Sequence, residues 1–408
     1  MNAATPYPHS APALSGPVAR ITSDRQAIHA ARALAGDFAR EASLRDSTRR
    51  LPWEELDRYS RSGLWGITVP KQYGGAGVSS ATLAEVIAII SAADGSLGQI
   101  PQNHFYALEV LRVGARPEQQ AAFYQRALAG ERFGNALAEI GHKDFKRRTR
   151  LIRHGDGSLR VDGRKFYCTG ALYANWIPTL AVSEEGPSFL VFVPRDAPGV
   201  AIVDDWDGFG QRITGSGSVV FENVRVDADW VVPFQASFDR PTTIGPFAQL
   251  LHAAIDHGIA EGAYAAALQF VRDHARPWID AGVERAADDP LTLERIGGLR
   301  VRLTASHALL QRAARTVDAA QLQPDQQSVA AASVAVAEAR ILSTDISLKA
   351  GSQLFELAGT ASTLAEHNLD RYWRNARTHT LHDPVRWKFH AVGNYYLNDK
   401  LPPRHGAL

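Results

Sequence analysis

The stretch Ser218-Val-Val-Phe-Glu-Asn-Val-Arg-Val226 decides the fold class of this chain, because its apolar residues follow the period of a β-strand. A second stretch of the same kind is Ser188-Phe-Leu-Val-Phe-Val-Pro194, and Gly, Asp and Pro separate such runs. Val, Ile and Phe are enriched in strands, whereas the separating residues favour turns. We therefore predict a β domain of short strands, a sandwich or a barrel, over residues 135–241.

The sequence on both sides of this region has helical spacing. Between residues 23 and 134, apolar residues recur every three or four positions, as in Leu83-Ala-Glu-Val-Ile-Ala-Ile-Ile90, which predicts a helical domain. Residues 242–408 contain long alanine-rich segments, which favour a helical bundle. Residues 1–22 are rich in Ala, Pro and Ser and are expected to form a disordered tail. The expected protein is an α+β multidomain protein.

Composition excludes several classes of function. The chain has 408 residues, 45% of them hydrophobic, and a formal net charge of +1, so we expect neither nucleic acid nor a membrane surface as a partner. Its single cysteine, Cys168, cannot form an intramolecular disulfide, and no Cys/His spacing is typical of a zinc site, so no metal is expected. The N-terminus lacks the features of a signal peptide and no long apolar run is present, which predicts a cytoplasmic protein.

The segment Arg374-Asn-Ala-Arg377-Thr-His379-Thr-Leu-His382-Asp383-Pro384 is the strongest candidate for chemistry. It brings together imidazoles, whose ordinary pKa lies near neutrality, and guanidiniums, which bind anions. This combination suits proton transfer around a phosphorylated cofactor or a reactive oxygen species. The alternative is that His379 and His382 only cap a helix, since Arg and His are favoured at helix C-termini.

Five motifs occur in order on elements of the expected type: Val69-Pro-Lys-Gln-Tyr-Gly-Gly-Ala-Gly77, Ala136-Leu-Ala-Glu139, Gly163-Arg-Lys-Phe-Tyr-Cys-Thr-Gly170, Phe221-Glu-Asn-Val-Arg-Val226 and Gln353-Leu-Phe-Glu-Leu-Ala-Gly359. Together they resemble the acyl-CoA dehydrogenase superfamily over roughly residues 25 to 400. The resemblance implies an acyl-CoA dehydrogenase-like fold, with an N-terminal helical domain, a central β-barrel or sandwich and a C-terminal four-helix bundle. It also implies that the third motif lies against a flavin ring.

The glutamate with which dehydrogenases of this superfamily abstract an α-proton is missing. The corresponding stretch reads Leu381-His-Asp-Pro384, and its shorter Asp383 is a poor base, because proton abstraction from carbon tolerates little displacement. The other position used for this base falls in Phe247–Ile255, which holds no carboxylate. The histidine segment, together with Gly210-Gln-Arg-Ile-Thr-Gly-Ser-Gly217 and Pro101-Gln-Asn-His-Phe105, instead resembles the flavin-dependent monooxygenase branch, with its dibenzothiophene monooxygenases and, more closely, its SfnB-type sulfur-acquisition oxidoreductases.

This branch implies a two-component FMNH2-dependent monooxygenase. An NAD(P)H-dependent flavin reductase would supply reduced flavin, and a C4a-hydroperoxyflavin formed with O2 would transfer oxygen to an organosulfur compound. By resemblance, His379 and His382 lie over the flavin, with His382 nearer the peroxide, Thr169 bonds flavin N5, and Asn135 and His104 complete the catalytic set. The alternatives are a core histidine for His104 and an ordinary strand threonine for Thr169.

The resemblance also bears on the cofactor. Glu356 and Leu357 replace the glycines that let the FAD pyrophosphate approach the backbone, which favours FMN over FAD. Arg276 stands where the superfamily places a phosphate-binding arginine from a partner subunit, although it could be a solvated helix-end residue. A homotetramer, a dimer of dimers, is therefore expected. The remaining expected flavin contacts are Leu137, Tyr167, Cys168, Thr169, Gln353, Gly359, Thr360 and Arg377.

Two other functions stay open. One is an acyl-CoA dehydrogenase-like FAD oxidoreductase, against which the missing glutamate counts, and the other is a non-catalytic flavin-binding scaffold, which would have no use for the histidines. The substrate is also open, since the aromatic residues Phe105, Tyr106, Tyr173 and Trp176 are equally suited to a pocket wall and to a core.

Overall fold

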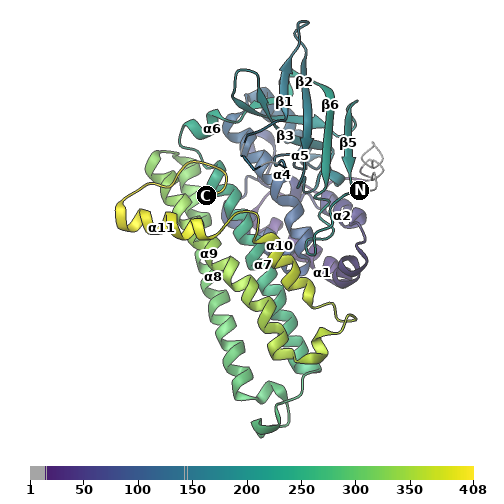
Figure 1. The fold of residues 1–408 in the computed structure, drawn as a ribbon, viewed down its shortest axis with the longest axis vertical. Helices are drawn as coiled ribbons and strands as arrows, with labels where there is room; N and C mark the ends of the chain where they lie inside the picture. The colour runs from purple at the N-terminus through teal and green to yellow at the C-terminus, as the bar shows by residue number, and fades with distance from the viewer. Residues whose placement is uncertain (1–13, 15, 142, 145) are drawn as a thin grey trace.

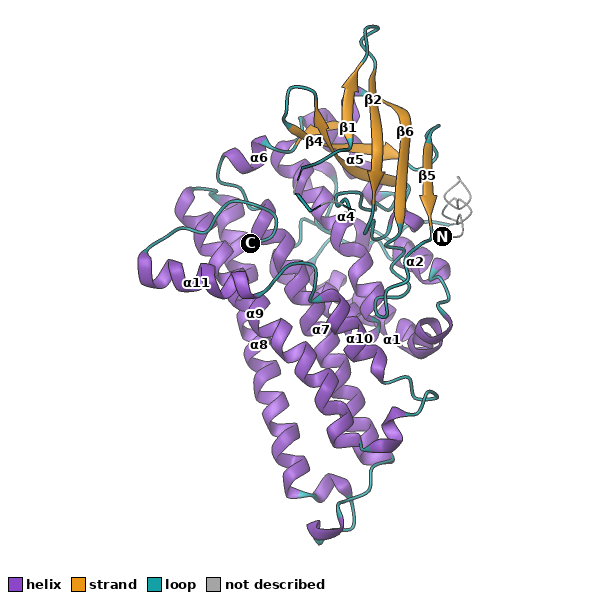
Figure 2. Cartoon of the chain, viewed as in Figure 1, coloured by secondary structure: helices purple, strands orange, loops and turns teal. Residues whose placement is uncertain are grey.

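The computed structural model describes residues 14, 16–141, 143–144 and 146–408. Most of the expected tail, residues 1–22, lies outside the described residues. The strands gather at one end of the molecule, the N-terminal helices lie beneath and beside them, and three long helices extend away from the sheet (Figures 1 and 2). Among the described residues, no helix combines the length and apolar character that a bilayer span requires.

The N-terminal part is helical as predicted. Polar side chains cap three of its helices: the Ser23 hydroxyl accepts from the Gln26 backbone N–H, the Ser79 hydroxyl from that of Thr82, and the Asp94 carboxylate from those of Ser96 and Leu97. Such caps satisfy backbone donors that have no partner inside the helix. The helices are α1 (Asp24–Thr48), α2 (Trp53–Arg61), α3 (Ser80–Ala93), α4 (Gly95–Gly114) and α5 (Pro117–Leu128).

The central part forms one continuous seven-stranded sheet, in the order β5-β6-β2-β1-β3-β4-β7. Strands β1 and β3 are parallel and the other neighbours are antiparallel. The expected sandwich or barrel thus takes the form of an open mixed sheet whose edge strands, β5 and β7, do not pair with each other. Its strands are β1 (Arg150–Arg153), β2 (Leu159–Lys165), β3 (Trp176–Ser183), β4 (Ser188–Pro194), β5 (Val200–Val203), β6 (Ser218–Val226) and β7 (Val231–Pro233).

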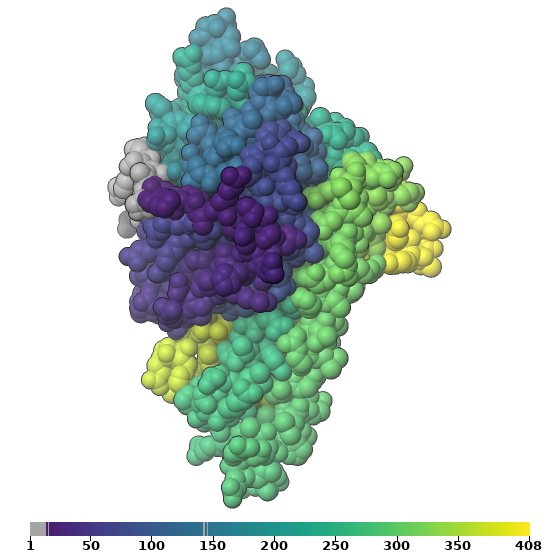
Figure 3. Space-filling view, turned by 180° about the vertical axis from the view of Figure 1, so that it is seen from behind, coloured from purple at the N-terminus to yellow at the C-terminus, as the bar shows by residue number. Residues whose placement is uncertain are grey.

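The C-terminal part is a bundle in which α7 packs against α8, α9 and α10, and also against α3 and α4 of the N-terminal part. Asp289 and Asp325 cap the starts of α8 and α9. Helix α11 packs against α9, and the end of the chain that contains it projects from the edge of the molecule (Figure 3). The helices are α6 (Ala236–Asp239), α7 (Ile244–Asp273), α8 (Pro290–Leu322), α9 (Gln326–Ala358), α10 (Asp370–His379) and α11 (Arg386–Asn398). The boundaries of the domains remain predictions.

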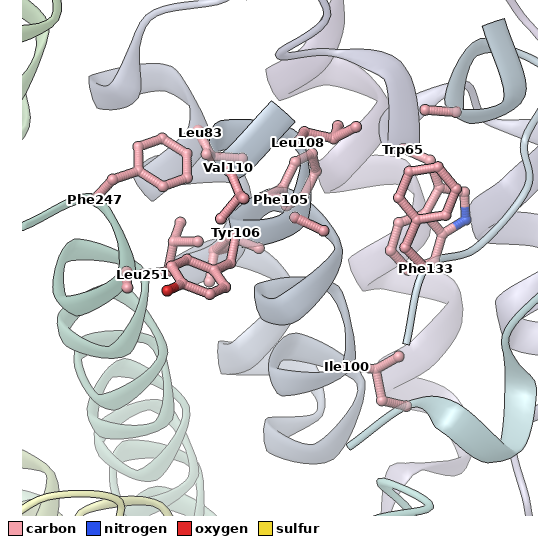
Figure 4. Packing of buried hydrophobic residues seen from close by; sticks show 14 of the residues in the cluster. Trp65, Leu83, Ile100, Phe105, Tyr106, Leu108, Val110, Phe133, Phe247 and Leu251 are labelled. Carbon is pink, nitrogen blue, oxygen red and sulfur yellow. The ribbon is translucent and has the colours of Figure 1, made fainter. Parts of the chain in front are cut away.

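The main core joins these parts through α4. Figure 4 shows Phe105 and Tyr106 of α4 between Trp65 on one side and Phe247 of α7 on the other. The aromatic residues that could have formed a pocket wall are core residues instead, with exposed fractions of 0% for Phe105, 6% for Tyr106, 1% for Tyr173 and 6% for Trp176. Burial of this much aromatic surface holds α4 rigidly between the sheet and the bundle.

Candidate active site

A cavity of about 570 Å³ lies where α4, α7, the segment after α10 and the loops at one end of the sheet meet. Five of the residues expected from the sequence line it: Asn135, Leu137, Tyr167, Thr169 and His382. The cavity is also lined by Gln99, Trp206, Phe209, Gln211, Ser216, His252, Leu381, Asp383, Gly406 and Ala407.

The loop between β5 and β6 reaches the cavity because it docks on α10. Gly210 has to be glycine, since a Cβ atom there would lie 2.0 Å from the Arg374 carbonyl oxygen. The Gln211 backbone N–H donates to Asn375 Oδ1 at 2.7 Å, and the Arg374 guanidinium donates to the Phe209 carbonyl at 2.9 Å. The guanidinium of Arg374 also pairs with Asp46 of α1 at 2.6 Å. Arg374 therefore holds the wall of the cavity in place.

Three hydroxyl groups form a chain that ends at the cavity. Thr169 Oγ1 lies 2.8 Å from Ser216 Oγ, which lies 2.6 Å from Thr214 Oγ1, and Thr214 donates to the Gln211 carbonyl oxygen at 2.9 Å. A carbonyl only accepts, and each hydroxyl has one proton, so the protons must run from Thr169 to Ser216 to Thr214 to the carbonyl. Thr169 consequently presents an oxygen lone pair to the cavity as a hydrogen-bond acceptor.

Several buried amide atoms of the cavity wall have no hydrogen-bond partner among the described residues. They are the side-chain oxygens of Gln99, Asn135 and Gln249 and both ends of the Gln211 side chain. An unsatisfied buried polar group costs about 1–3 kcal/mol, so such groups are usually completed by a ligand. With the aromatic rings of Trp206 and Tyr167 beside them, they fit a flat ring system that carries polar atoms along its edge, which an isoalloxazine does.

His382 is held in one tautomer at the cavity. Its Nδ1–H donates to the His379 carbonyl oxygen at 2.7 Å, and its Nε2 accepts from Gln99 Nε2 at 2.9 Å. Burial lowers the pKa of this imidazole, which keeps it neutral near pH 7.

The structure places His379 behind the wall rather than over the cavity. Its side chain is fully buried, with Nδ1 2.5 Å from Asp256 Oδ1 and Nε2 3.1 Å from His252 Nδ1. Asp256 also forms a buried ion pair with Arg340 of α9. Burial and the neighbouring imidazole and guanidinium groups hold the pKa of His379 well below its usual value. His252 lines the cavity in its place.

Two expected residues belong to the core. His104 is 0% exposed, with Nδ1 accepting from the Phe133 backbone N–H at 3.1 Å and Nε2 donating to the Trp65 carbonyl at 2.9 Å. Burial lowers the pKa of His104 to about 3, and both of its ring nitrogens are bonded to the backbone, so it is a neutral structural link with no nitrogen available to the cavity. Cys168 is also fully buried, which raises the pKa of its thiol, and it does not line the cavity.

Four expected cofactor residues lie at the far end of the bundle, outside the cavity lining: Arg276, Gln353, Gly359 and Thr360. The end of α7 at Asp273 is 21 residues from His252, which corresponds to about 32 Å along the helix. At that distance Arg276, which follows α7, does not reach the cavity of its own chain. Arg377, half-buried on α10, does not line the cavity either.

The residues that sequence reasoning missed had weak signals. His252 lies inside Phe247–Ile255, the segment in which some dehydrogenases of the superfamily carry their base, and Asp256 is the first residue after it. The imidazoles of His252, His379 and His382 each offer a nitrogen within 4.8 Å of the others. Four of the six ring nitrogens form hydrogen bonds to one another, to Asp256 or to Gln99, and a fifth donates to a carbonyl oxygen. The three histidines therefore form a hydrogen-bond network.

Comparison with known proteins agrees with this architecture. Residues 23–131 match the acyl-CoA dehydrogenase N-terminal domain and residues 250–387 the acyl-CoA dehydrogenase C-terminal domain. A probable FMNH2-dependent monooxygenase, SfnC of Pseudomonas putida, is 33% identical over 93% of this chain and 97% of its own. Dibenzothiophene monooxygenase of Rhodococcus erythropolis is 32% identical, with coverage of 94% and 96%. The crystal structure of TdsC from Paenibacillus sp. A11-2 with FMN and indole superposes with a TM-score of 0.90 at 32% identity, covering 94% of this chain and all of TdsC. The protein belongs to the acyl-CoA dehydrogenase family and, within it, groups with the flavin-dependent monooxygenases.

Proposed function

We propose that the protein is the oxygenase of a two-component system, which binds reduced FMN from a separate NAD(P)H-dependent reductase and transfers one atom of O2 to an organosulfur compound. The observation that carries the proposal is the acceptor lone pair of Thr169 at the cavity. The reduced flavin ring carries an N5–H donor, whereas the oxidised ring has a lone pair at N5. A fixed acceptor at this point therefore favours the reduced form.

Bound FMN would supply the two electrons that activate O2, and the chain's own groups would orient it. Tyr167 and Trp206 offer apolar faces for the ring, while the free side-chain oxygen of Asn135 and the free amide group of Gln211 can bond its polar edge. Leu137 would pack against the same ring. Enclosure of the ring also excludes water, which protects reactive oxygen species from side reactions.

The phosphate of FMN needs cations, and none of the residues lining the cavity is Lys or Arg. We propose that Arg276 from a second copy supplies the charge, with Gln353, Gly359 and Thr360 beside it. Arg276 is exposed, and the nearby apolar residues Trp278 and Ile279 have exposed fractions of 70% and 87%. Exposed apolar side chains of this kind are expected on a surface that another subunit covers. The proposed assembly is a homotetramer.

The acyl-CoA dehydrogenase alternative requires a carboxylate base that faces the substrate. Asp383 lines the cavity, but its carboxylate is 2.7 Å from the Lys388 ammonium. Although burial alone would raise the pKa of Asp383, Arg340 and Lys388 outweigh it and lower that pKa, which weakens the base. Asp256 is fully buried and engaged by Arg340. This arrangement favours oxygen transfer over α-proton abstraction.

The FAD alternative meets a different obstacle. Glu356 at the end of α9 projects a carboxylate that pairs with Arg295 of α8 at 3.0 Å, at the end of the bundle where an adenine diphosphate from a neighbour would lie in the superfamily. A carboxylate at that place would repel a second phosphate. FMN, which has a single phosphate, is therefore the proposed cofactor.

The substrate class follows from the relatives and from the wall. SfnC is named as a probable FMNH2-dependent monooxygenase, and the second relative is named for dibenzothiophene, a sulfur compound. In this chain Phe209 and Leu381 line the cavity with apolar surface, and their exposed fractions are 51% and 65%. An apolar sulfide, sulfoxide, sulfone or sulfinate fits such a wall.

The test mixes the protein with photoreduced FMN and O2 in the presence of a panel of sulfides, sulfoxides, sulfones and sulfinates. We expect one panel member to gain 16 mass units with oxygen uptake that matches product. Hydrogen peroxide as the only product for the whole panel, together with reduction of FAD-loaded protein by acyl-CoA thioesters, would instead establish the dehydrogenase alternative.

A further inference from the structure

A carboxylate and two imidazoles form a second chain, which runs from the inside of the bundle to the cavity. Asp256 Oδ1 is 2.5 Å from His379 Nδ1, and His379 Nε2 is 3.1 Å from His252 Nδ1. Asp256 and His379 are 0% exposed, whereas His252 is 8% exposed and lines the cavity. We call these three residues the imidazole chain.

The protonation pattern of the imidazole chain follows from its buried end. Asp256 also pairs with Arg340 and accepts from the Thr344 hydroxyl at 3.2 Å, so the carboxylate is ionised and can only accept. His379 must then carry its proton on Nδ1 and leave Nε2 bare. That bare nitrogen accepts from His252, which therefore carries its own proton on Nδ1. The remaining nitrogen, His252 Nε2, is bare, has no hydrogen-bond partner among the described residues and belongs to a ring at the cavity wall.

We propose that His252 is a catalytic base of this cavity, and that His379 and Asp256 are positioning residues that fix its tautomer. An N–H or O–H group in the cavity gives its proton to His252 Nε2, and the Nδ1 proton of His252 moves to His379 Nε2. The positive charge then lies on His379, in contact with the Asp256 carboxylate. A buried carboxylate that orients and stabilises an imidazolium in this way is known from hydrolase triads.

The identity of the proton donor rests on the proposed function. In that reaction the reduced cofactor brings two hydrogens, O2 gives one oxygen atom to sulfur, and the second oxygen atom leaves with both hydrogens as water. The imidazole chain takes up one of these hydrogens as a proton and returns it, by the reverse transfers, to the departing oxygen. No proton is gained or lost over a turnover.

The charges around the imidazole chain make its protonation transient. Burial comes first among the causes that hold the pKa values of His252 and His379 well below the usual range. His382 and the Arg340 guanidinium of α9 lower both pKa values further, and the Lys388 ammonium of α11 also lowers that of His252. The carboxylate in contact with His379 is Asp256, and Asp383 pairs with Lys388. Both imidazoles are therefore neutral at rest, which leaves His252 Nε2 free to accept a proton.

The first test measures tautomers in the flavin-free protein. Nitrogen NMR of histidine-labelled protein at pH 7, with the His252 signals identified by their loss in His252→Phe, should show a protonated Nδ1 and a bare Nε2. In Asp256→Asn the amide can donate to His379 Nδ1, which reverses the chain and puts the His252 proton on Nε2. A protonated Nε2 in the unsubstituted protein would overturn the proposal, even if Asp256→Asn does not fold because Arg340 loses its partner.

The second test measures oxygen transfer with saturating reduced FMN. A positioned base contributes about 100-fold or more, so His252→Phe should lower the rate of product formation by at least about that factor. His257→Phe is the matched control, because His257 is a buried histidine of the same helix that bonds Ser306 at 3.2 Å and lies outside the cavity lining. A rate within about threefold of normal for His252→Phe would contradict a catalytic base. If the unsubstituted protein oxygenates no sulfur compound, the proposed function fails, whereas a bare His252 Nε2 would still support the imidazole chain.

Discussion

Removal of the Thr169 hydroxyl should weaken the binding of reduced FMN more than that of oxidised FMN. The hydroxyl chain leaves Thr169 with a lone pair toward the cavity, which can accept from N5–H of the reduced ring and cannot bond the lone pair of the oxidised ring. One such hydrogen bond contributes about 0.5–1.5 kcal/mol, so Thr169→Ala should weaken reduced FMN by roughly two- to thirteenfold. Thr169→Ser keeps the oxygen and should bind both forms normally.

The assay is a pair of titrations, anaerobic for reduced FMN and aerobic for oxidised FMN, with the midpoint potential of bound flavin as an independent check. Since 30 mV corresponds to about 1.4 kcal/mol for two electrons, the potential should fall by about 10–30 mV in Thr169→Ala. Ser216→Ala provides a sharper control, because it frees the Thr169 proton to point into the cavity and should lower the potential without removing Thr169. An unchanged ratio of the two affinities in both variants would refute the assigned direction of the hydroxyl chain.

Three further outcomes follow from the site. His382→Ala should keep FMN binding but yield hydrogen peroxide in place of oxygenated product, because the hydrogen-bonding ring nitrogens of His382 at the cavity are lost. Coupled turnover in that variant would return His382 to a helix-end role. Arg276→Ala should need more than about tenfold more FMN for saturation, since a charge-assisted hydrogen bond contributes about 1.5–3 kcal/mol. Once saturated, this variant should form as much oxygenated product per reduced flavin as the unsubstituted protein. An unchanged FMN titration would exclude Arg276 from the phosphate site. Acid should destabilise the fold through His104, whose pKa is lowered to about 3 in the folded protein, because below about pH 6.5 only the unfolded chain takes up a proton at this residue. Between pH 7 and pH 5 the free energy of unfolding should fall by about 2 kcal/mol for this reason. Urea unfolding should therefore show a smaller pH dependence in His104→Gln.

Local patterns in the sequence were sufficient for the elements and for part of the site. The alternation in Ser218–Val226 correctly predicted β6, and the motif Gly163–Gly170 placed Tyr167 and Thr169 together at the cavity. The open form of the sheet could not be predicted from the sequence, because the parallel pairing of β1 with β3 depends on contacts between segments that are distant along the chain. Sequence position likewise gave no sign of the face of α4 that carries His104, which turns inward to bond Trp65.

The imidazole chain shows the same limit at the site itself. The resemblance implied that both His379 and His382 lie over the flavin, yet the short helix α10 turns His379 toward α7 and leaves His382 at the cavity. His252 and Asp256 are one helical turn apart on α7, which lets both meet His379, a partner 127 and 123 residues away. Only packing of α7 against α10 creates this group.

Two hydrogen-bond chains thus reach the cavity, and both end in an acceptor. The hydroxyl chain is fixed by the Gln211 carbonyl and presents Thr169 Oγ1, and the imidazole chain is fixed by the Asp256 carboxylate and presents His252 Nε2. A ligand rich in N–H donors satisfies both, as reduced FMN does, whereas oxidised FMN has lost the hydrogen at N5. We therefore expect the oxidised cofactor to dissociate more readily than the reduced one, which is what an oxygenase that depends on a separate reductase requires.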